Sequence, residues 1–319
     1  MIHWLAELDG RRIVVEVPAT SANLGAGYDC LGLALDLTNR IELEVRGWSR
    51  GEIELVVTGE GVDELQPDRS NRFVRGLEAA LGAARGEMPA GAGWRIAMAN
   101  GIPLERGLGS SAAATVAGLV AGNALTGERL TTPDLLRLGM EIEGHADNVS
   151  AALLGGFVVA TAAGGTVEAI RFDVPRDLRV VVFIPEVRFK TSAMRAVLPK
   201  NVPLADAVSN LGRVALGVAG LATGRHELLR LLTVDRLHER YRAAAYPQLP
   251  VLIEAAREAG AIGACLSGAG STVIAFADAV GTLTRIQSAL TAAAAEADLP
   301  GRLLIVSPRN EGARVLSLQ

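Results

Sequence analysis

The sequence predicts an α+β protein, in which strands and helices form separate groups instead of alternating regularly along the chain. Strand-like segments come first, a run of helices follows, and a second mixed group occupies the C-terminal half. The length of 319 residues suggests two domains. We place the boundary near residues 165–178, which gives an N-terminal domain over 1–170 and a C-terminal domain over 171–319.

The N-terminal half begins with strands. Residues 13–17, 41–45 and 53–58 are apolar or alternate between apolar and polar, which predicts strands in an antiparallel arrangement. A helix follows from Asn71, where apolar residues recur at helical spacing. The remaining predicted elements are a strand at 94–99, helices at 110–125 and 133–143, and a hairpin of strands at 157–161 and 167–172.

The C-terminal half opens with an apolar strand at 179–184, which Pro175 and Pro185 flank. Helical periodicity dominates the segment that follows it, and two more strands come afterwards. The predicted elements are helices at 205–221, 225–232 and 249–259, strands at 263–266 and 272–277, and a helix at 281–297.

Composition narrows the classes of function. The net charge is −4 and Lys and Arg form no block, so nucleic acid is a poor partner. The apolar segments are short or interrupted, which argues against a membrane span. Charged residues near the start, with no apolar stretch before them, argue against a signal peptide and predict a cytoplasmic location. The two cysteines, Cys30 and Cys265, suit small buried thiols better than a disulfide framework or a metal site.

A glycine-rich segment before the helix at 110–125 is the most informative motif. Gly107 and Gly109 let the backbone approach a polyphosphate, and the free N–H groups and positive dipole end of the helix would face that anion. The motif therefore predicts a nucleotide site. The expected nucleotide-binding residues are Pro103, Leu104, Glu105, Arg106, Gly107, Leu108, Gly109, Ser110, Ser111, Ala112 and Ala113.

Other readings of this segment exist. Gly-x-Gly-x-x-Ala at 107–112 formally fits the dinucleotide fingerprint, but a loop separates it from the preceding strand. The chain has no Walker motif. Taken alone, the segment also fits a structural role, in which a serine caps a core helix and the glycines turn the chain.

Two further segments are rich in small and polar residues. Residues 18–32 directly follow a strand, and their mixture of glycine and polar residues predicts a binding loop rather than core. Residues 266–272 form another glycine loop between two predicted strands.

In their order and spacing, these three motifs resemble those of the GHMP kinase family, named for galactokinase, homoserine kinase, mevalonate kinase and phosphomevalonate kinase. Ser-Ala-Asn-Leu-Gly at 21–25 and Glu-Gly-His-Ala-Asp-Asn-Val at 143–149 are similar to the homoserine kinase branch. The third motif departs from the usual pattern at Ala269 and Ser271, but both residues are small. The resemblance covers nearly the whole chain.

The resemblance implies a fold and an activity. The fold has an N-terminal domain with a left-handed βαβ crossover and a C-terminal ferredoxin-like domain, with ATP in the cleft between them. The activity is the Mg²⁺-assisted phosphorylation of homoserine by ATP, which gives O-phospho-homoserine for threonine biosynthesis. Dimers are frequent in the family, so the resemblance allows a homodimer but does not fix the oligomeric state. The alternatives are a kinase for another small alcohol, such as mevalonate or threonine, and a catalytically silent ligand sensor on the same fold.

A magnesium site needs a hydroxyl and a carboxylate near the phosphates. The resemblance favours Ser111 over Ser110 as the hydroxyl ligand. Glu141 and Glu143 lie two residues apart on the helix at 133–143, so they cannot point the same way. Glu141 flanks the apolar face of this helix, which makes it the expected metal ligand.

Asn148 resembles the residue that holds the acceptor hydroxyl in homoserine kinases, where other members of the family carry an Asp as general base. An amide cannot take a proton, so catalysis would depend on positioning and electrostatics, with Asp147 as the alternative for a proton role. The same segment also fits a plain turn after the helix.

An amino-acid substrate needs arginines for its carboxylate. The resemblance assigns that role to Arg195 and Arg242. Asn23 and Asp29 resemble residues that face the amino acid. The other expected substrate contacts are His145, Thr191 and Gly268, and Asn71 is expected near adenine.

Overall fold

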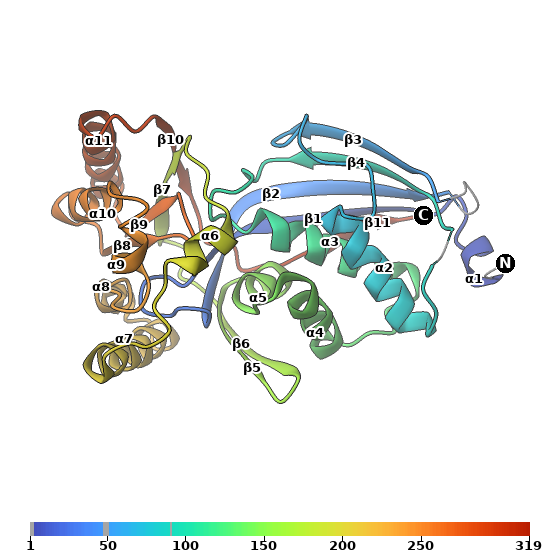
Figure 1. Ribbon diagram of the computed structural model, residues 1–319, viewed down its shortest axis with the longest axis horizontal. Coiled ribbons are helices and arrows are strands. Elements are labelled where there is room, and N and C mark those ends of the chain that lie inside the picture. The colour runs from blue at the N-terminus through green and yellow to red at the C-terminus, as the bar shows by residue number, and fades with distance from the viewer. Residues whose placement is uncertain (1–2, 47–50, 90) are drawn as a thin grey trace.

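Two β-sheets organise the protein, and helices pack against both of them (Figure 1). The structure is a computed structural model that describes residues 3–46, 51–89 and 91–319. The first sheet and its helices occupy the right of Figure 1, and the second sheet with its helices lies on the left.

The first sheet has seven strands, and β2 is its longest. Its central order is β11-β1-β2-β4-β3, and β5 pairs with β2 and with β6 beyond this path. The strands are β1 (Arg12–Ala22), β2 (Leu31–Val45), β3 (Ile53–Gly59), β4 (Trp94–Asn100), β5 (Phe157–Ala163), β6 (Thr166–Phe172) and β11 (Arg314–Leu318).

The pairing of β3 corrects one prediction. β1 and β2 are antiparallel as expected, but β3 runs parallel to β4, with helix α2 (Arg72–Arg85) between them in the chain. Parallel neighbours need a crossover connection, and α2 supplies it. A βαβ unit therefore stands where the strand pattern alone predicted an antiparallel arrangement, and the family resemblance had implied a βαβ crossover in this domain.

Four helices cover one face of the first sheet (Figure 1). They are α2, α3 (Ser110–Leu125), α4 (Thr132–Glu143) and α5 (Asp147–Leu154), and a short helix α1 (His3–Ala6) lies near the end of the sheet. Asn71 caps α2, and Thr131 and Asp134 form a capping box on α4. The sequence did not predict α5, because a helix of only eight residues is too short to show a clear apolar period.

The second sheet has the order β10-β7-β9-β8, with every neighbour antiparallel. The succession β7-α10-β8-β9-α11-β10 with this strand order is the ferredoxin-like topology. The strands are β7 (Arg179–Pro185), β8 (Gly263–Leu266), β9 (Val273–Ala277) and β10 (Gly301–Val306). The helices are α6 (Thr191–Ala196), α7 (Leu204–Ala222), the 3-10 helix η1 (His226–Leu228), α8 (Leu229–Leu232), α9 (Glu239–Arg242), α10 (Leu249–Glu258) and α11 (Val280–Glu296).

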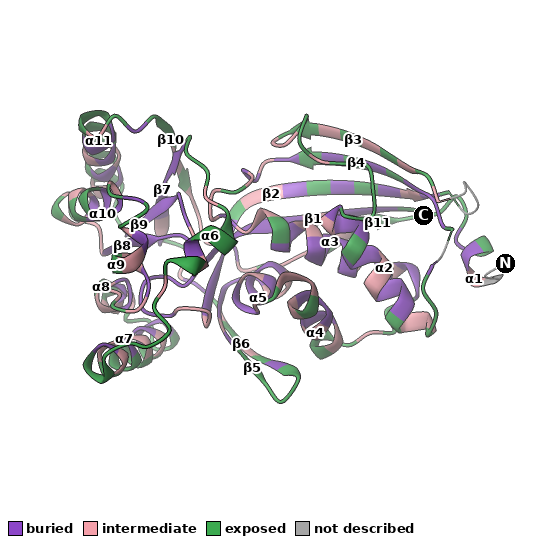
Figure 2. Ribbon diagram, viewed as in Figure 1, coloured by how far each residue is buried: buried purple, intermediate pink, exposed green. Residues whose placement is uncertain are grey.

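One apolar core continues through both halves. Along β7, Val180 and Val182 join the core that also contains the first sheet, while Val181 and Phe183 face the separate core under α10 and α11. The alternation follows from the twofold side-chain period of a strand. β7, β8 and β9 are therefore buried on both faces, as the purple strands of Figure 2 show, whereas β10 is more exposed.

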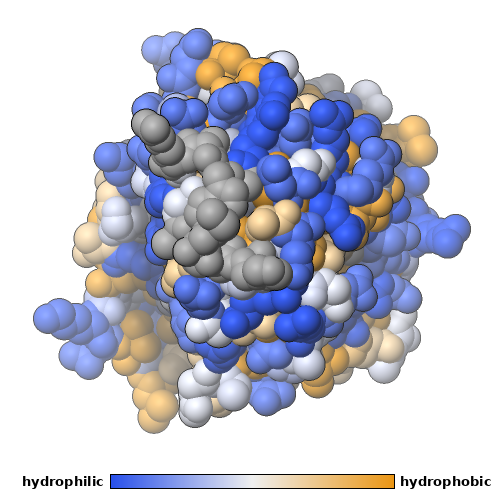
Figure 3. All heavy atoms as spheres, turned by 90° about the vertical axis from the view of Figure 1, so that its right-hand side faces the viewer, coloured by the Kyte–Doolittle hydropathy of each residue, from blue (hydrophilic) through white to orange (hydrophobic). Residues whose placement is uncertain are grey.

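β11 returns to the first sheet after the ferredoxin-like topology is complete, and it pairs with β1. The domain boundary at residue 170 remains a prediction, and it falls within β6. No helix of the described ranges is both long and apolar enough to cross a membrane. Hydrophilic side chains predominate over the visible part of the end that carries β11 and α1 (Figure 3).

Candidate active site

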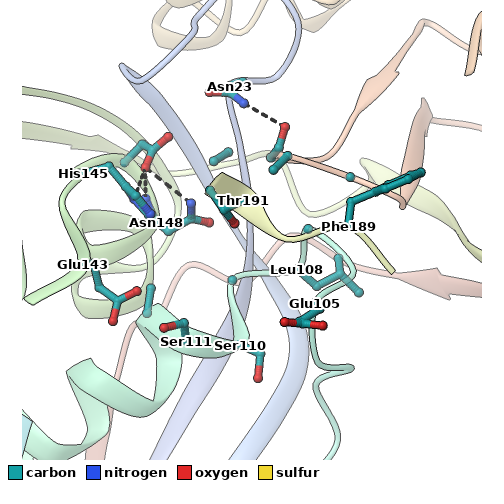
Figure 4. Close-up of a pocket in the computed structure, with 18 of the residues that line it drawn as sticks. Asn23, Glu105, Leu108, Ser110, Ser111, Glu143, His145, Asn148, Phe189 and Thr191 are labelled. Carbon is teal, nitrogen blue, oxygen red and sulfur yellow. Dashed lines mark hydrogen bonds and ion pairs between the residues drawn. The ribbon is translucent and has the colours of Figure 1, made fainter. Parts of the chain in front are cut away.

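A cleft of about 690 Å³ opens between the two halves of the protein. One wall consists of the glycine loop and the start of α3, and a second consists of the segment that joins α4 to α5. Residues of α6, α9 and the β8–β9 loop form the third wall. In Figure 4, Ser110, Ser111 and Glu143 lie in the lower part of the cleft, and Asn23, His145, Asn148 and Thr191 lie above them.

The glycine loop has the geometry of a backbone cradle. Gly107 and Gly109 have φ values of +76° and +68°, where side chains are disfavoured. A Cβ on Gly107 would lie 2.1 Å from the Ser267 carbonyl oxygen, and one on Gly109 would lie 1.9 Å from Thr20 Oγ1. Gly109 is the N-cap of α3, so neither serine after it caps the helix through its side chain. Both serines line the cleft.

The predicted nucleotide residues divide into two groups. Glu105 to Ala112 line the cleft, whereas Pro103, Leu104 and Ala113 lie outside its wall. Asn71 lines an adjoining hollow of about 310 Å³ beside Ser110 and Ser111. Its side chain accepts a hydrogen bond from Phe73 N and donates one to the Gln66 carbonyl, so it also fixes the start of α2.

The expectation for the two carboxylates of α4 needs correction. Glu141 lies outside the cleft, with 52% of its side chain exposed, and forms an ion pair with Arg137 one turn earlier. Glu143 lines the cleft with 4% of its side chain exposed. The buried face of α4 includes Leu136 and Gly139, and Glu143 follows them at helical spacing.

Glu143 is held by two partners from neighbouring helices. Thr115 Oγ1 of α3 donates a hydrogen bond to its Oε1 at 2.6 Å, and Arg72 of α2 lies 3.5 Å away. Glu143 and Ser111 both line the cleft, and Figure 4 draws both in its lower part. Within the described ranges, no group of three or more His, Cys, Asp or Glu side chains is arranged to hold a metal ion.

The segment before α5 carries a hydrogen-bonded chain. Asp147 Oδ1 lies 2.9 Å from His145 Nδ1 and accepts from the backbone N–H of Asn148. Thr20 Oγ1 donates to Asn148 Oδ1 at 2.8 Å. Burial lowers the pKa of His145, but the hydrogen bond and the charge of Asp147, together with Glu143, outweigh it, so the pKa is raised above its usual value. The segment is thus more than a turn, because it brings three polar side chains to the cleft.

Arg195 and Asp29 form a bidentate ion pair in the cleft, with both N–O distances at 2.7 Å. Arg195 also donates to the Tyr28 hydroxyl at 2.9 Å. Asp29 and Asn23 both have positive φ, which Asp and Asn tolerate better than most residues, and Asp29 N donates to Asn23 Oδ1. Part of the predicted loop at 18–32 is strand, however, since residues 18–22 are buried in β1.

Arg242 is nearly fully buried, at 2% exposure, yet it lines the cleft. Its Nη1 donates to the Gly268 carbonyl at 2.7 Å and lies 3.1 Å from His238 Nδ1. Burial lowers the pKa of His238 to about 4, so its ring is neutral near pH 7. A neutral ring whose Nδ1 accepts from Arg242 carries its proton on Nε2, which donates to the Gly25 carbonyl at 2.8 Å.

Several residues of the site were missed from sequence. Thr20 contacts Asn148, and His238 supports Arg242. The ring of Tyr28 lies under both Arg195 and Arg242, with 5.6 Å between the ring centroid and the guanidinium carbon of each. Thr20 and Tyr28 belong to the first glycine-rich motif, which was the available signal. His238 had none, because a single histidine four residues before an arginine is common on any helix. The remaining predicted contacts, Thr191 and Gly268, both line the cleft.

Two family models match the chain. "GHMP kinases N terminal domain" matches residues 71–156, which contain the glycine loop, and "GHMP kinases C terminal" matches residues 218–296, which contain α9 and the β8–β9 loop. The two matched segments together cover more than half of the chain and contain most of the cleft wall.

The curated relatives are more specific. A homoserine kinase of Caldicellulosiruptor bescii is 40% identical over 312 residues, which are 96% of this chain and 98% of that protein. A homoserine kinase of Streptomyces coelicolor is 46% identical over 268 residues, 83% of this chain and 84% of that protein. The chain belongs to the homoserine kinase branch of the GHMP kinase family.

Solved structures share the fold. The crystal structure of homoserine kinase from Cytophaga hutchinsonii has a TM-score of 0.84 and 29% identity, and the match covers 96% of this chain and 97% of that chain. A mevalonate kinase from L. major matches at a TM-score of 0.68 with 17% identity, covering 94% of this chain and 98% of that one, which shows the fold alone.

Proposed function

We propose that this enzyme transfers the γ-phosphoryl group of ATP to the hydroxyl of homoserine and produces O-phospho-homoserine for threonine biosynthesis. The observation that carries the proposal is a single cleft that combines a glycine cradle at a helix N-terminus with two arginines on the facing wall. The similarity of the chain to curated homoserine kinases over most of its length supports homoserine as the substrate.

The glycine cradle binds the phosphates of ATP. Its backbone N–H groups and the positive end of α3 favour an anion, and Gly107 and Gly109 leave no side chain in the way. The adjoining hollow that Asn71 lines is the proposed adenine site, because it lies next to Ser110 and Ser111 and contains the apolar side chains of Leu65 and Met98.

Glu143 and Ser111 are the proposed protein ligands of Mg²⁺. A buried carboxylate and a hydroxyl beside the phosphate cradle suit a hard cation that prefers oxygen and takes its other ligands from phosphate and water. When bound, Mg²⁺ would neutralise charge on the transferring phosphoryl group. Thr115 and Arg72 fix the orientation of the Glu143 carboxylate.

The acceptor hydroxyl is positioned by Asn148. Thr20 donates to Asn148 Oδ1, so the Asn148 amide group is held in one orientation toward the cleft. Asp147 accepts from His145 and from the Asn148 backbone, which leaves it a supporting residue rather than a free base. Catalysis then depends on alignment and charge neutralisation more than on proton abstraction.

Arg242 and Arg195 recognise the substrate carboxylate, and Asp29 recognises its ammonium group. Arg242 is fixed by Gly268 and His238, so it is preorganised. The ion pair of Arg195 with Asp29 brings one cation and one anion together, which complements the two charges of an amino acid.

A comparison of substrates tests this function. With ATP and Mg²⁺, kcat/KM for homoserine should exceed that for 3-aminopropan-1-ol, which lacks the carboxylate, by at least about a hundredfold, since the aminoalcohol forgoes the charged hydrogen bonds to the two arginines. Mevalonate and threonine should be poor substrates. Equal activity on the aminoalcohol would contradict the carboxylate site, and ligand binding without ADP release would indicate a sensor instead of an enzyme.

A cytoplasmic location and a homodimer belong to the same proposal. The homodimer is supported by the resemblance to a family in which dimers are frequent. Both stay predictions.

A further inference from the structure

The two arginines of the carboxylate site share one aromatic neighbour. Arg195 belongs to α6 and Arg242 ends α9, so the two side chains reach the cleft from separate helices. Tyr28, from the loop between β1 and β2, contacts both of them, with 5.6 Å between its ring centroid and each guanidinium carbon. These distances are within the range of a cation–π contact. A single ring therefore stabilises both cations.

Tyr28 also makes a polar contact with one of the two arginines. Arg195 Nη1 donates to the Tyr28 hydroxyl at 2.9 Å and to Asp29 at 2.7 Å. Burial and the charge of Asp29 raise the pKa of Tyr28, so the hydroxyl keeps its proton near pH 7 and binds Arg195 as a neutral acceptor. The ammonium group of an amino acid would compete with Arg195 for Asp29. The contact with the hydroxyl does not depend on that competition.

The shared ring matters because the two guanidinium groups repel each other. Burial lowers the pKa of Arg242, and the positive charge of Arg195 lowers it further. A bound carboxylate would compensate this repulsion, but the protein has to hold both charges in place before the substrate arrives. The negative face of an aromatic ring reduces that cost. His238 lies against the same ring, with 5.3 Å between the ring centroids, and its neutral form adds no third charge.

The loop that carries Tyr28 is fixed to the C-terminal half, where both arginines lie. Ala26 N donates to the Leu232 carbonyl at 2.8 Å, and the Ala26 carbonyl accepts from the Asn210 side chain at 3.1 Å. Asp29 and both arginines line the cleft, whereas Tyr28 does not. Tyr28 therefore affects a bound substrate through the arginines rather than by direct contact.

We propose that Tyr28 is a positioning residue that holds Arg195 and Arg242 together as one carboxylate site and so contributes to the choice of an amino acid as substrate. This inference deepens the proposed function and rests on it. The ring aligns both guanidinium groups, and the hydroxyl retains Arg195 when the substrate ammonium group binds Asp29. Loss of the hydroxyl should weaken the contact with Arg195 alone, and loss of the ring should weaken both arginines.

Two substitutions separate the hydroxyl from the ring. Tyr28→Phe keeps the ring and should raise KM for homoserine by about threefold to tenfold, as expected for one lost hydrogen bond. Tyr28→Leu removes both cation–π contacts as well and should raise this KM by about thirtyfold or more. Both variants should keep kcat and KM for ATP within about threefold of the wild type, because the lost interactions concern substrate binding.

Tyr241→Leu is the matched control. Tyr241 also lies against an arginine of α9, with 4.7 Å between its ring centroid and the guanidinium carbon of Arg240, but neither residue lines the cleft. KM for homoserine should therefore equal that of the wild type. A rise as large as that of Tyr28→Leu would mean that any tyrosine removed from this region disturbs the site, and it would contradict the specific role of Tyr28.

The aminoalcohol 3-aminopropan-1-ol shows whether Tyr28 acts through the carboxylate site. The kcat/KM for this substrate should be alike in the wild type and in both Tyr28 variants, because it has no carboxylate for the arginines to bind. An equal loss on both substrates, or an unchanged KM for homoserine in Tyr28→Leu, would overturn the proposal and leave the kinase function intact. A wild type that does not prefer homoserine to the aminoalcohol would overturn both.

A double-mutant cycle tests the contact between the hydroxyl and Arg195. The effect of Tyr28→Phe on kcat/KM for homoserine should disappear in an Arg195→Gln protein, because the hydroxyl then has no guanidinium group to hold. Additive losses would mean that the hydroxyl acts elsewhere and would contradict the proposal. Tyr28→Phe and this cycle decide the question even if Tyr28→Leu does not fold.

Discussion

At the scale of a residue, Glu141 and Glu143 show how the position of a side chain around a helix decides its chemistry, because two residues apart they lie on different sides of α4. Glu141 faces solvent and pairs with Arg137, an exposed i,i+4 contact that contributes about 0.3–0.5 kcal/mol. Glu143 is buried at the cleft and is oriented by Thr115 and Arg72. The two side chains are chemically identical, so burial alone separates their roles.

Replacing each by glutamine gives a matched pair of variants. Glu143→Gln removes a charged oxygen ligand without changing shape, so kcat should fall on the order of a hundredfold and the Mg²⁺ requirement should rise. Glu141→Gln should keep nearly normal activity. Steady-state rates over a series of Mg²⁺ concentrations measure both effects. A strongly reduced kcat for Glu141→Gln, together with a normal kcat for Glu143→Gln, would show that Glu141 is the metal ligand.

The sequence predicted this pair only in part, and the reason is physical. Apolar residues show where a helix is buried, but α4 is buried over a wide arc that includes Gly139, which has no side chain to mark it. Thr20 and His238 were missed for a related reason. Thr20 contacts Asn148, 128 positions away, and His238 contacts the Gly25 carbonyl, 213 positions away. Local sequence patterns carry no information on such long-range contacts.

At the scale of elements, α2 and α3 approach each other closely through glycines. A Cβ on Gly118 of α3 would lie 2.1 Å from the Phe73 carbonyl oxygen, and one on Gly76 of α2 would lie 2.2 Å from that of Thr115. Thr115, which takes part in this close contact, also donates the hydrogen bond to Glu143. Close helix packing and the orientation of the site are therefore connected.

Gly118→Ala should destabilise the protein by about 1–3 kcal/mol, because the helices would have to move apart. Gly281→Ala is the control, since a Cβ at Gly281 of α11 meets no atom within 4 Å. That change should be neutral or stabilise by up to about 1 kcal/mol, as expected for alanine in a helix. Urea denaturation measures both. Equal stability of the two variants would show that α2 and α3 can separate at no cost.

Elements with strong periodicity were predictable, and those without it were not. The helix at 110–125 and the strands at 179–184 and 263–266 match the structure closely, because burial fixes their apolar patterns. β3 was predicted as a strand but with the wrong pairing, since direction depends on the crossover and not on the strand itself. β11 was missed because it is a mostly exposed edge strand with little apolar pattern.

At the scale of the whole molecule, one partly buried acid makes stability depend on pH. Glu239 is partly buried in the C-terminal half, and its Oε1 accepts from Leu266 N at 2.7 Å. Burial raises the pKa of Glu239 from 4.5 to about 8, against the lowering effect of the Leu266 bond. Between these values the folded protein holds a proton that the unfolded chain has lost.

Stability should therefore fall as pH rises through that window, by up to about 1.4 kcal/mol per pH unit for this one proton. Glu239→Gln removes the titration, so the stability of the wild type relative to this variant should decline from about pH 5 to about pH 8 and then level off. Urea denaturation of both proteins across this range gives the difference directly. A constant difference would mean that Glu239 ionises alike in both states.

The return of β11 to the first sheet has a consequence for how the chain folds as it is made. Ile13 pairs with Leu318, so the outer edge of β1 finds its partner only after almost all of the sequence has been synthesised. Until then β1 presents an open edge, which is a site where other chains can add. The ferredoxin-like half is translated and can fold while the outer edge of β1 is still unpaired. The N-terminal sheet is therefore the first part of the protein to begin forming and the last to be completed.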